Sequence, residues 1–149
     1  MKPLTVFLSF LLPLAAFAGQ NNASPHALIE AEYRQYVRDF IAKDYEAIAS
    51  HFNPPVQRTN SEGSLVLQTT ADIISMYQNM MENIQKGYSY SELDSIDVKA
   101  MSRTTYAVDV VFTRYNANDE VIFEGRSIYL FGNQSGEWKM FSMIEADRE

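Results

Sequence analysis

Asp109 is the carboxylate of this chain whose position could place it in a catalytic role. It interrupts residues 103–115, a β-branched and aromatic stretch that is typical of a strand. Facing a cavity, it could act as a general base. Facing outward, it would pair with Arg126 of the next strand, unless Arg126 pairs with Glu124 instead. Asp109 is therefore a weak catalytic candidate.

The two histidines do not form a predicted site. His26 precedes the first predicted helix, and His51 lies near the end of the second, where the helix dipole favours a charged imidazole. Neither has His, Asp or Glu neighbours at metal-ligand spacing, so no metal site and no cofactor are predicted. The chain has no cysteine, no glycine-rich phosphate loop and no Ser–His–Asp grouping in a recognisable context. Thiolate chemistry is thereby excluded.

The first 18 residues have the pattern of a secretory signal peptide. One lysine precedes a continuous apolar run, and Ala16-Phe17-Ala18 before Gly19 is a small-x-small cleavage site. The run is shorter than the roughly 20 residues that a membrane-spanning helix needs. We expect secretion across the inner membrane, into the bacterial periplasm, with no membrane anchoring after cleavage. Residues 19–26 are expected to be a linker, and residues 27–149 a single domain.

The composition excludes one class of partner. The formal net charge is −7, and nucleic-acid binding needs a basic footprint, so no nucleic acid is expected as a partner. Because the chain has no cysteine, an apolar core must provide the stability that disulfides give many small exported domains.

The elements that must position any site begin with a helical stretch at residues 27–52. Apolar residues recur there at steps of three and four, which predicts an amphipathic helix. The pattern breaks at Ala42-Lys43-Asp44. Asp44 is a suitable N-cap for a shorter helix that includes Phe52 and ends at Pro54-Pro55.

The rest of the chain predicts a hairpin, one more helix and a sheet. Residues 56–68 form the hairpin, and Thr69 caps a third helix that Gly87 ends. Strands are predicted at residues 88–100, 103–115, 121–131 and 137–146, with Trp138 anchoring the last. Helices followed by an antiparallel meander indicate an α+β fold, a curved sheet wrapped around three N-terminal helices.

Two motifs support a family resemblance, "DYEAIASHF" after the first helix and "SGEWKMFSMIEA" at the end. With this order of elements, residues 27–146 resemble the nuclear-transport-factor-2-like superfamily. The superfamily includes ketosteroid isomerase and the SnoaL-like polyketide cyclases. The resemblance implies a cystatin-like layer arrangement in which the sheet forms a cone. Its open end would be a pocket under the helices.

Comparison with ketosteroid isomerase implies a site without its base. The tyrosine that serves as oxyanion donor matches Tyr36, but the general-base aspartate falls on Asn60 and the second acid on Tyr129. Asparagine cannot take a proton from carbon, so the site would hold a polar atom rather than move a proton. The alternative is that both tyrosines are core residues with satisfied hydroxyls. The predicted ligand-binding residues are Tyr36, Phe40, Asn60, Tyr77, Phe112 and Tyr129.

These features predict an exported, non-catalytic domain that binds a small molecule, or an accessory domain. The pocket is expected to be largely apolar and its ligand a small apolar molecule. Several methionines suit varied apolar ligands, although ordinary core packing is the better explanation for them. One alternative is an enzyme of the SnoaL or ketosteroid isomerase type with an unidentified carboxylate base. Another is a protein-interaction module with a filled pocket.

The long predicted strands are apolar on both faces. In residues 121–131, for example, Phe123 and Tyr129 oppose Ile128 and Leu130. Three helices can cover only one face, and monomers rarely expose large apolar patches. A two-fold contact is the commonest way to cover such a patch, so we expect a homodimer through the outer face of the sheet.

Overall fold

A computed structural model describes residues 23–148, and every structural statement below concerns that part of the chain. The predicted signal peptide lies outside it. The helices are α1 Pro25–Ala42, α2 Tyr45–Ser50 and α3 Thr70–Glu82. The strands are β1 Phe52–Asn60, β2 Gly63–Leu67, β3 Tyr88–Ala100, β4 Thr105–Asn116, β5 Val121–Gly132 and β6 Lys139–Ala146.

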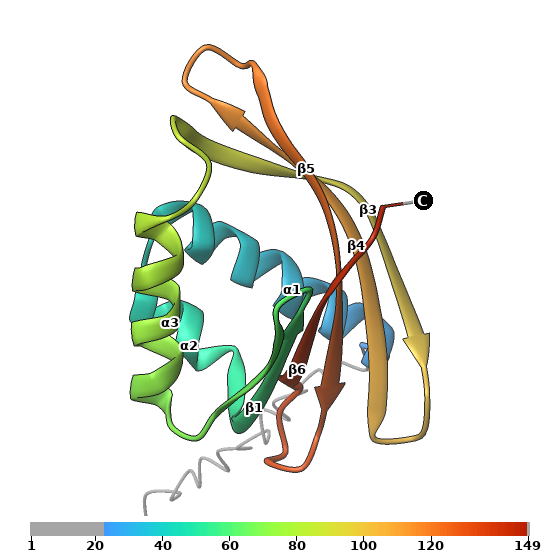
Figure 1. Ribbon diagram of the computed structural model, residues 1–149. Coiled ribbons are helices and arrows are strands. Elements are labelled where there is room, and N and C mark those ends of the chain that lie inside the picture. Colours follow the sequence, from blue (N-terminus) through green and yellow to red (C-terminus); the bar gives the residue numbers. More distant parts are fainter. Residues whose placement is uncertain (1–22, 149) are drawn as a thin grey trace, which may run out of the picture.

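The helices all lie on one side of a curved sheet, as Figure 1 shows. The long strands β3 to β6 bend past α1, and α3 stands opposite them with a space between. The predicted α+β arrangement, a curved sheet around the N-terminal helices, is confirmed. None of the helices in residues 23–148 is long and apolar enough to cross a membrane.

The sheet has six strands in the order β2-β1-β6-β5-β4-β3. Strands β3 to β6 form the predicted antiparallel meander, and β1 and β2 form the predicted hairpin. The hairpin joins the meander because β1 pairs with β6 in parallel, with Arg58 opposite Met143. Local sequence patterns do not show this pairing, since the two strands are far apart along the chain.

The corner between α1 and α2 forms as predicted, with one correction. The Asp44 carboxylate accepts the backbone N–H of Ala47 at 3.0 Å, which caps α2. Lys43, just before it, has a left-handed backbone with φ 57°. However, α2 ends at Ser50, and Phe52 is the first residue of β1 rather than part of the helix.

Two other boundaries differ from the prediction. Helix α1 begins at Pro25, because the Ser24 hydroxyl caps it, so His26 lies inside its first turn. The capping box of Thr69 and Asp72 opens α3 as expected. Gly87 does not end α3, which stops at Glu82. With φ +86°, Gly87 instead turns the chain into β3.

The core lies between the helices and the concave face of the sheet. Helix α1 contributes a stripe spaced at three and four residues, which the amphipathic pattern predicted. Its members are Ile29, Tyr33, Tyr36 and Phe40. The sheet meets them with buried residues that include Val56, Val108, Val110, Tyr129, Phe131 and Met140.

The outer face of the sheet has an apolar centre and a charged surround. Cross-strand register makes Ile128 a neighbour of Ile144, with Leu130 and Val111 on the same face. All four are half-buried. Arg148 bonds Glu124 at 2.7 Å beside them. The homodimer through this face stays a prediction.

Trp138 lies immediately before β6 and packs edge-on against Tyr106, with ring centroids 5.1 Å apart. Because it is half-buried, Trp138→Ala should lower the free energy of unfolding by about 2 kcal/mol, less than the 3–5 kcal/mol of a fully buried aromatic. Urea denaturation measures this. Met101→Ala, at a side chain 64% exposed, is the control and should change stability by about 0.5 kcal/mol or less. Equal effects of the two substitutions would show that Trp138 does not anchor the strand.

Candidate functional site

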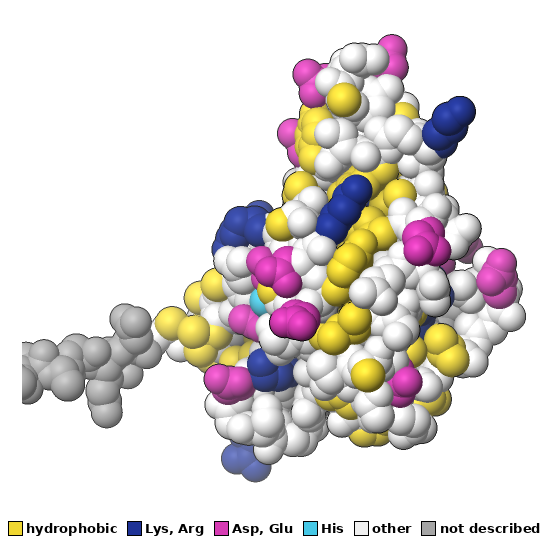
Figure 2. All heavy atoms as spheres, turned by 90° about the vertical axis from the view of Figure 1, so that its left-hand side faces the viewer, with side chains coloured by type: hydrophobic (Ala, Val, Ile, Leu, Met, Phe, Trp, Pro, Cys, Tyr) yellow, Lys and Arg dark blue, Asp and Glu magenta, His cyan; other side chains and the backbone are white. Residues whose placement is uncertain are grey.

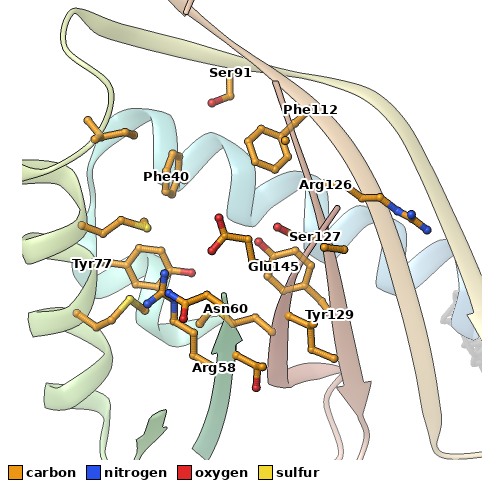
Figure 3. A pocket seen from close by; sticks show the side chains of 18 of the residues that line it. Phe40, Arg58, Asn60, Tyr77, Ser91, Phe112, Arg126, Ser127, Tyr129 and Glu145 are labelled. Carbon is orange, nitrogen blue, oxygen red and sulfur yellow. The ribbon is translucent and has the colours of Figure 1, made fainter. Parts of the chain in front are cut away.

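A cavity of about 1040 Å³ opens between α1, α3, the hairpin and the concave face of the sheet. The close-up in Figure 3 shows side chains converging on it from all these elements. Hydrophobic side chains also form a band up the middle of the helix-covered side of the molecule, with a basic side chain lying in it (Figure 2). The six residues predicted to bind a ligand all line the cavity: Tyr36, Phe40, Asn60, Tyr77, Phe112 and Tyr129.

Four tyrosines form the floor of the cavity. Tyr33 and Tyr36 come from α1, Tyr77 from α3 and Tyr129 from β5, and all are buried. The Tyr36 and Tyr77 hydroxyls are 2.8 Å apart, and the ring centroids of Tyr33 and Tyr129 are 5.0 Å apart. Burial raises the pKa of Tyr33, Tyr36 and Tyr77 well above 10, so these phenols stay neutral.

The hydrogen bond in this cluster differs from the sequence-based expectation, in which Tyr36 and Tyr129 donate to one ligand atom. Tyr36 bonds Tyr77 instead, and its ring lies 5.8 Å from that of Tyr129. In a pair of hydroxyls one donates and the other keeps its own hydrogen, so the pair retains one O–H for a ligand. Sequence reasoning missed Tyr33, although it lies three residues before Tyr36 on the same helical stripe.

Asn60 ends β1 at the rim of the hairpin and lines the cavity. Its side-chain oxygen accepts the backbone N–H of Glu62 at 3.0 Å, which stabilises the turn. The carbonyl of the amide is therefore already engaged, while the NH₂ group can still donate to a ligand.

Asp109 does not line the cavity, so it does not fit the role of a base there. It forms two bonds to Arg126 on the outer face, from Nε at 3.0 Å and Nη2 at 2.7 Å. Arg126 points away from the cavity (Figure 3). This hydrogen-bonded arginine lowers the pKa of Asp109. The predicted cross-strand pair of Asp109 and Arg126 on the outer face is confirmed.

Glu145 is the inward carboxylate that sequence reasoning missed. On β6 it lies opposite Ser127, and it points into the cavity towards the phenols of Tyr77 and Tyr129 (Figure 3). Its carboxylate makes no hydrogen bond or ion pair with residues 23–148, and the side chain is exposed. A register shift beside Leu130 changes the alternation along β6, so simple alternation could not place Glu145.

Four arginines line the cavity, and none was predicted to do so: Arg58, Arg114, Arg126 and Arg148. Arg58 comes from β1 and is close enough to Tyr77 to act against the burial that raises the pKa of that phenol. Arg114 comes from β4 and lies among four aromatic rings. Its guanidinium carbon is 5.1–5.8 Å from the ring centroids of Phe40, Tyr88, Phe112 and Phe123.

Arg114 is held in place on one side only. Its Nη1 donates to the side-chain oxygen of Gln85 at 2.7 Å, whereas its buried Nε has no partner within residues 23–148. Burial lowers the pKa of Arg114. The rings thus position this guanidinium in the wall, where the charge of Glu145 acts on it without a direct ion pair.

Gly125 allows the aromatic wall to form. It lies opposite Phe112 across the β4–β5 pair. A Cβ atom at this position would be 2.5 Å from the ring of Phe112 and 2.6 Å from that of Phe123. Only glycine lets both rings pack flat against the strand here.

His51 connects α2 to α1 behind the cavity. Its Nδ1 is 2.8 Å from Glu32 and its Nε2 is 2.7 Å from Asp39. Burial of the ring lowers the His51 pKa, but hydrogen bonds to the two carboxylates outweigh this effect and raise it above 6.5. The two hydrogen bonds therefore tie the helix corner to α1 and favour the protonated imidazole. Within residues 23–148, no group of three His, Asp or Glu side chains is arranged to hold a metal ion.

Comparison with protein families decides what kind of domain this is. The profile of the family described as NTF2-like protein (DUF6841) matches residues 25–148. The chain belongs to this NTF2-like family. The resemblance to the nuclear-transport-factor-2-like superfamily is thereby confirmed. A search of curated protein sequences gives no match.

Solved structures resemble this NTF2-like domain in fold. A cystatin-like domain of unknown function from Nostoc punctiforme is 18% identical, with TM-score 0.65 over 81% of this chain and 75% of that one. An NTF2-like protein of unknown function from Pseudomonas putida is 13% identical, with TM-score 0.67 over 83% and 86%. A proposed scytalone dehydratase from Novosphingobium aromaticivorans is 12% identical, with TM-score 0.62 over 82% and 83%. At these identities the similarity shows the fold alone.

The raised pKa of His51 predicts a pH-dependent stability. The protonated ring stabilises the fold fully below about pH 6.5, its ordinary value, and the contribution is lost as pH rises through the raised pKa. The free energy of unfolding, measured by urea denaturation, should therefore be about 2 kcal/mol higher for wild type than for His51→Gln at pH 5.5. At pH 9 the difference should be much smaller.

His26→Gln is the matched control, because His26 is exposed at the start of α1. Its stability should follow that of wild type at both pH values. If the difference between wild type and His51→Gln stays constant from pH 5.5 to 9, the imidazole is not charged in the folded protein.

Proposed function

We propose that this NTF2-like domain binds a small molecule in the cavity and does not catalyse a reaction on it. The strongest support comes from which titratable side chains are buried in the cavity and which are exposed around it. The floor is made of buried phenols, whereas no histidine of residues 23–148 lines the cavity. The acidic residues that line it are all exposed: Glu62, Asp72, Glu92, Glu124, Glu145 and Asp147.

A general base for proton abstraction works best when its pKa lies near the operating pH. Burial is the usual means by which the pKa of a carboxyl group is raised to that value. The exposed carboxylates around this cavity lack that burial. The buried groups, in contrast, are phenols whose raised pKa values keep their protons on. Such groups hold an oxygen atom of a ligand by hydrogen bonds and do not take a proton from it.

The ligand expected here differs from the apolar molecule that the sequence predicted, because the cavity is only partly apolar. Apolar side chains such as Met76, Met80 and Ile84 line one wall. The remainder includes Arg58, Arg114 and Ser127, which can donate hydrogen bonds. The lining is suited to a molecule with an apolar body and at least one polar group.

Mass spectrometry under native conditions tests binding. Protein purified from its own source should carry an additional mass of a few hundred daltons, which denaturation releases. Ser127→Phe, inside the cavity, should abolish this mass. Ser95→Phe, on an exposed position of β3, should retain it. A mass that survives Ser127→Phe would mean that the ligand binds elsewhere.

The proposal includes export and self-association, supported by the leader pattern and by the apolar centre of the outer sheet face. The same spectra check both. The mature chain should begin at Gly19, and the native mass should be twice that of one mature chain. Exported protein that retains residues 1–18, or a native mass of one chain at micromolar concentration, would contradict the respective expectation.

A second candidate function is isomerase-type catalysis with Glu145 as base, which its inward direction towards the phenols favours. We expect it to fail: wild type should isomerise a β,γ-unsaturated cyclic ketone no faster than buffer. The conjugated α,β-unsaturated ketone that forms is followed by its ultraviolet absorbance. A rate above buffer that Glu145→Gln abolishes, and that the control Glu92→Gln retains, would overturn the non-catalytic proposal.

A further inference from the structure

The charges around the cavity are separated by depth. The acidic lining residues are all exposed, whereas Arg58 and Arg114 are half-buried. The other two arginines of the lining, Arg126 and Arg148, form ion pairs with Asp109 and Glu124. Because charges interact more strongly away from water, the deeper groups dominate the field that a ligand meets inside.

Arg58 has no partner in the fold. Its guanidinium makes no hydrogen bond or ion pair with any of residues 23–148, although a guanidinium carries five N–H donors. Arg58 lies opposite Met143 in the β1–β6 pair, so Glu145 is its diagonal neighbour on the same face. Long side chains can meet across such a diagonal, yet these two do not pair. Both remain directed to the cavity.

The neighbouring polar groups on the floor also donate. The pair Tyr36–Tyr77 retains one hydroxyl hydrogen, and the amide of Asn60 keeps its NH₂ group free. Because Tyr36 and Tyr77 stay neutral, an incoming anion meets no negative charge among these phenols. The inner part of the cavity is therefore rich in hydrogen-bond donors, whereas the carboxylates that line the cavity are exposed to solvent.

Arg114 contributes charge but is less suited to direct contact. Gln85 occupies its Nη1 at 2.7 Å, and four rings surround its guanidinium. It acts on a ligand through its positive field, from the wall that Phe112 and Phe123 build. Arg58 is the guanidinium that is open to a bidentate contact.

We propose that the cavity selects organic acids and that Arg58 binds their carboxylate group. A carboxylate matches the planar fork of a guanidinium and forms two parallel hydrogen bonds with it. The apolar body of the acid packs against the aromatic and methionine side chains of α1 and α3. This inference names the ligand class of the proposed function and therefore rests on it.

Glu145 provides a test of the sign of the ligand charge. If the ligand is an anion at Arg58, the negative charge of its diagonal neighbour opposes binding, and Glu145→Gln should tighten it a few-fold. If the ligand were a cation, Glu145 would attract it, and the same substitution would weaken binding.

Matched compounds separate charge from shape. The probes are 2-naphthylacetate with its amide and decanoate with its amide, measured by isothermal titration calorimetry at pH 7.5 and low salt. Wild type should bind the better carboxylate roughly 10- to 100-fold more tightly than its amide, as expected for hydrogen bonds to a charged group. Arg58→Met should reduce this preference to about twofold or less and leave the affinity for the amide unchanged.

Two variants keep the test interpretable. Arg58→Lys retains the charge without the fork, so it should retain part of the preference even if Arg58→Met is poorly folded. Arg103→Met, exposed between β3 and β4, is the charge-matched control and should bind like wild type. Thermal unfolding of each variant reports whether the fold is intact.

The outcomes distinguish the two proposals. Amides that bind as tightly as carboxylates would overturn the inference about organic acids and leave small-molecule binding in place. Loss of carboxylate binding in Glu145→Gln, with Arg58→Met unaffected, would overturn the inference, because binding would then depend on Glu145 and not on Arg58. Failure of all four probes to bind at millimolar concentration, together with no retained mass in native spectra, would overturn both proposals.

Discussion

The packing of α1 against the concave face of the sheet is the constraint on which the rest of this structure depends. Its stripe of Ile29, Tyr33, Tyr36 and Phe40 supplies the helical half of the core. The long strands continue past this helix (Figure 1), and the cavity lies between them and α3. The cavity is therefore a consequence of the fold, because one amphipathic helix cannot cover a sheet of this curvature. His51 contacts Glu32 and Asp39 and so holds the end of α2 against α1.

The parallel pairing of β1 with β6 determines which polar groups enter this space. It brings Arg58 and Asn60 beside Met143 and Glu145, four residues that the chain separates widely. Without this pairing the hairpin would be a separate unit, and the cavity would lack both the guanidinium and one of its rims. The chemical character of the site thus depends on a long-range backbone contact, whereas its aromatic floor follows from the local periodicity of α1 and α3.

This division explains what the sequence could predict. Helix caps, the hairpin, the strand order of the meander and the aromatic floor follow from local patterns, and so Asp44, Thr69 and Tyr36 were placed correctly. Arg58 and Glu145 were missed because their positions require the β1–β6 register and the register shift in β6. The partners of His51 were not predicted for a similar reason, since they lie 19 and 12 residues away on another helix.

Asp109 and Glu145 show why residue type alone does not identify a functional carboxylate. Both occupy long strands of the same sheet, and Asp109 interrupts its apolar stretch more conspicuously. Two hydrogen bonds to Arg126 use its oxygens and lower its pKa, so Asp109 is bound to the fold. Glu145 and its neighbour Arg58 remain unpaired on the inner face. In a closed core two such charges would have to pair or be replaced, because an isolated buried charge is costly. Their persistence is compatible with stability because both line a cavity that is open to solvent, rather than a closed core.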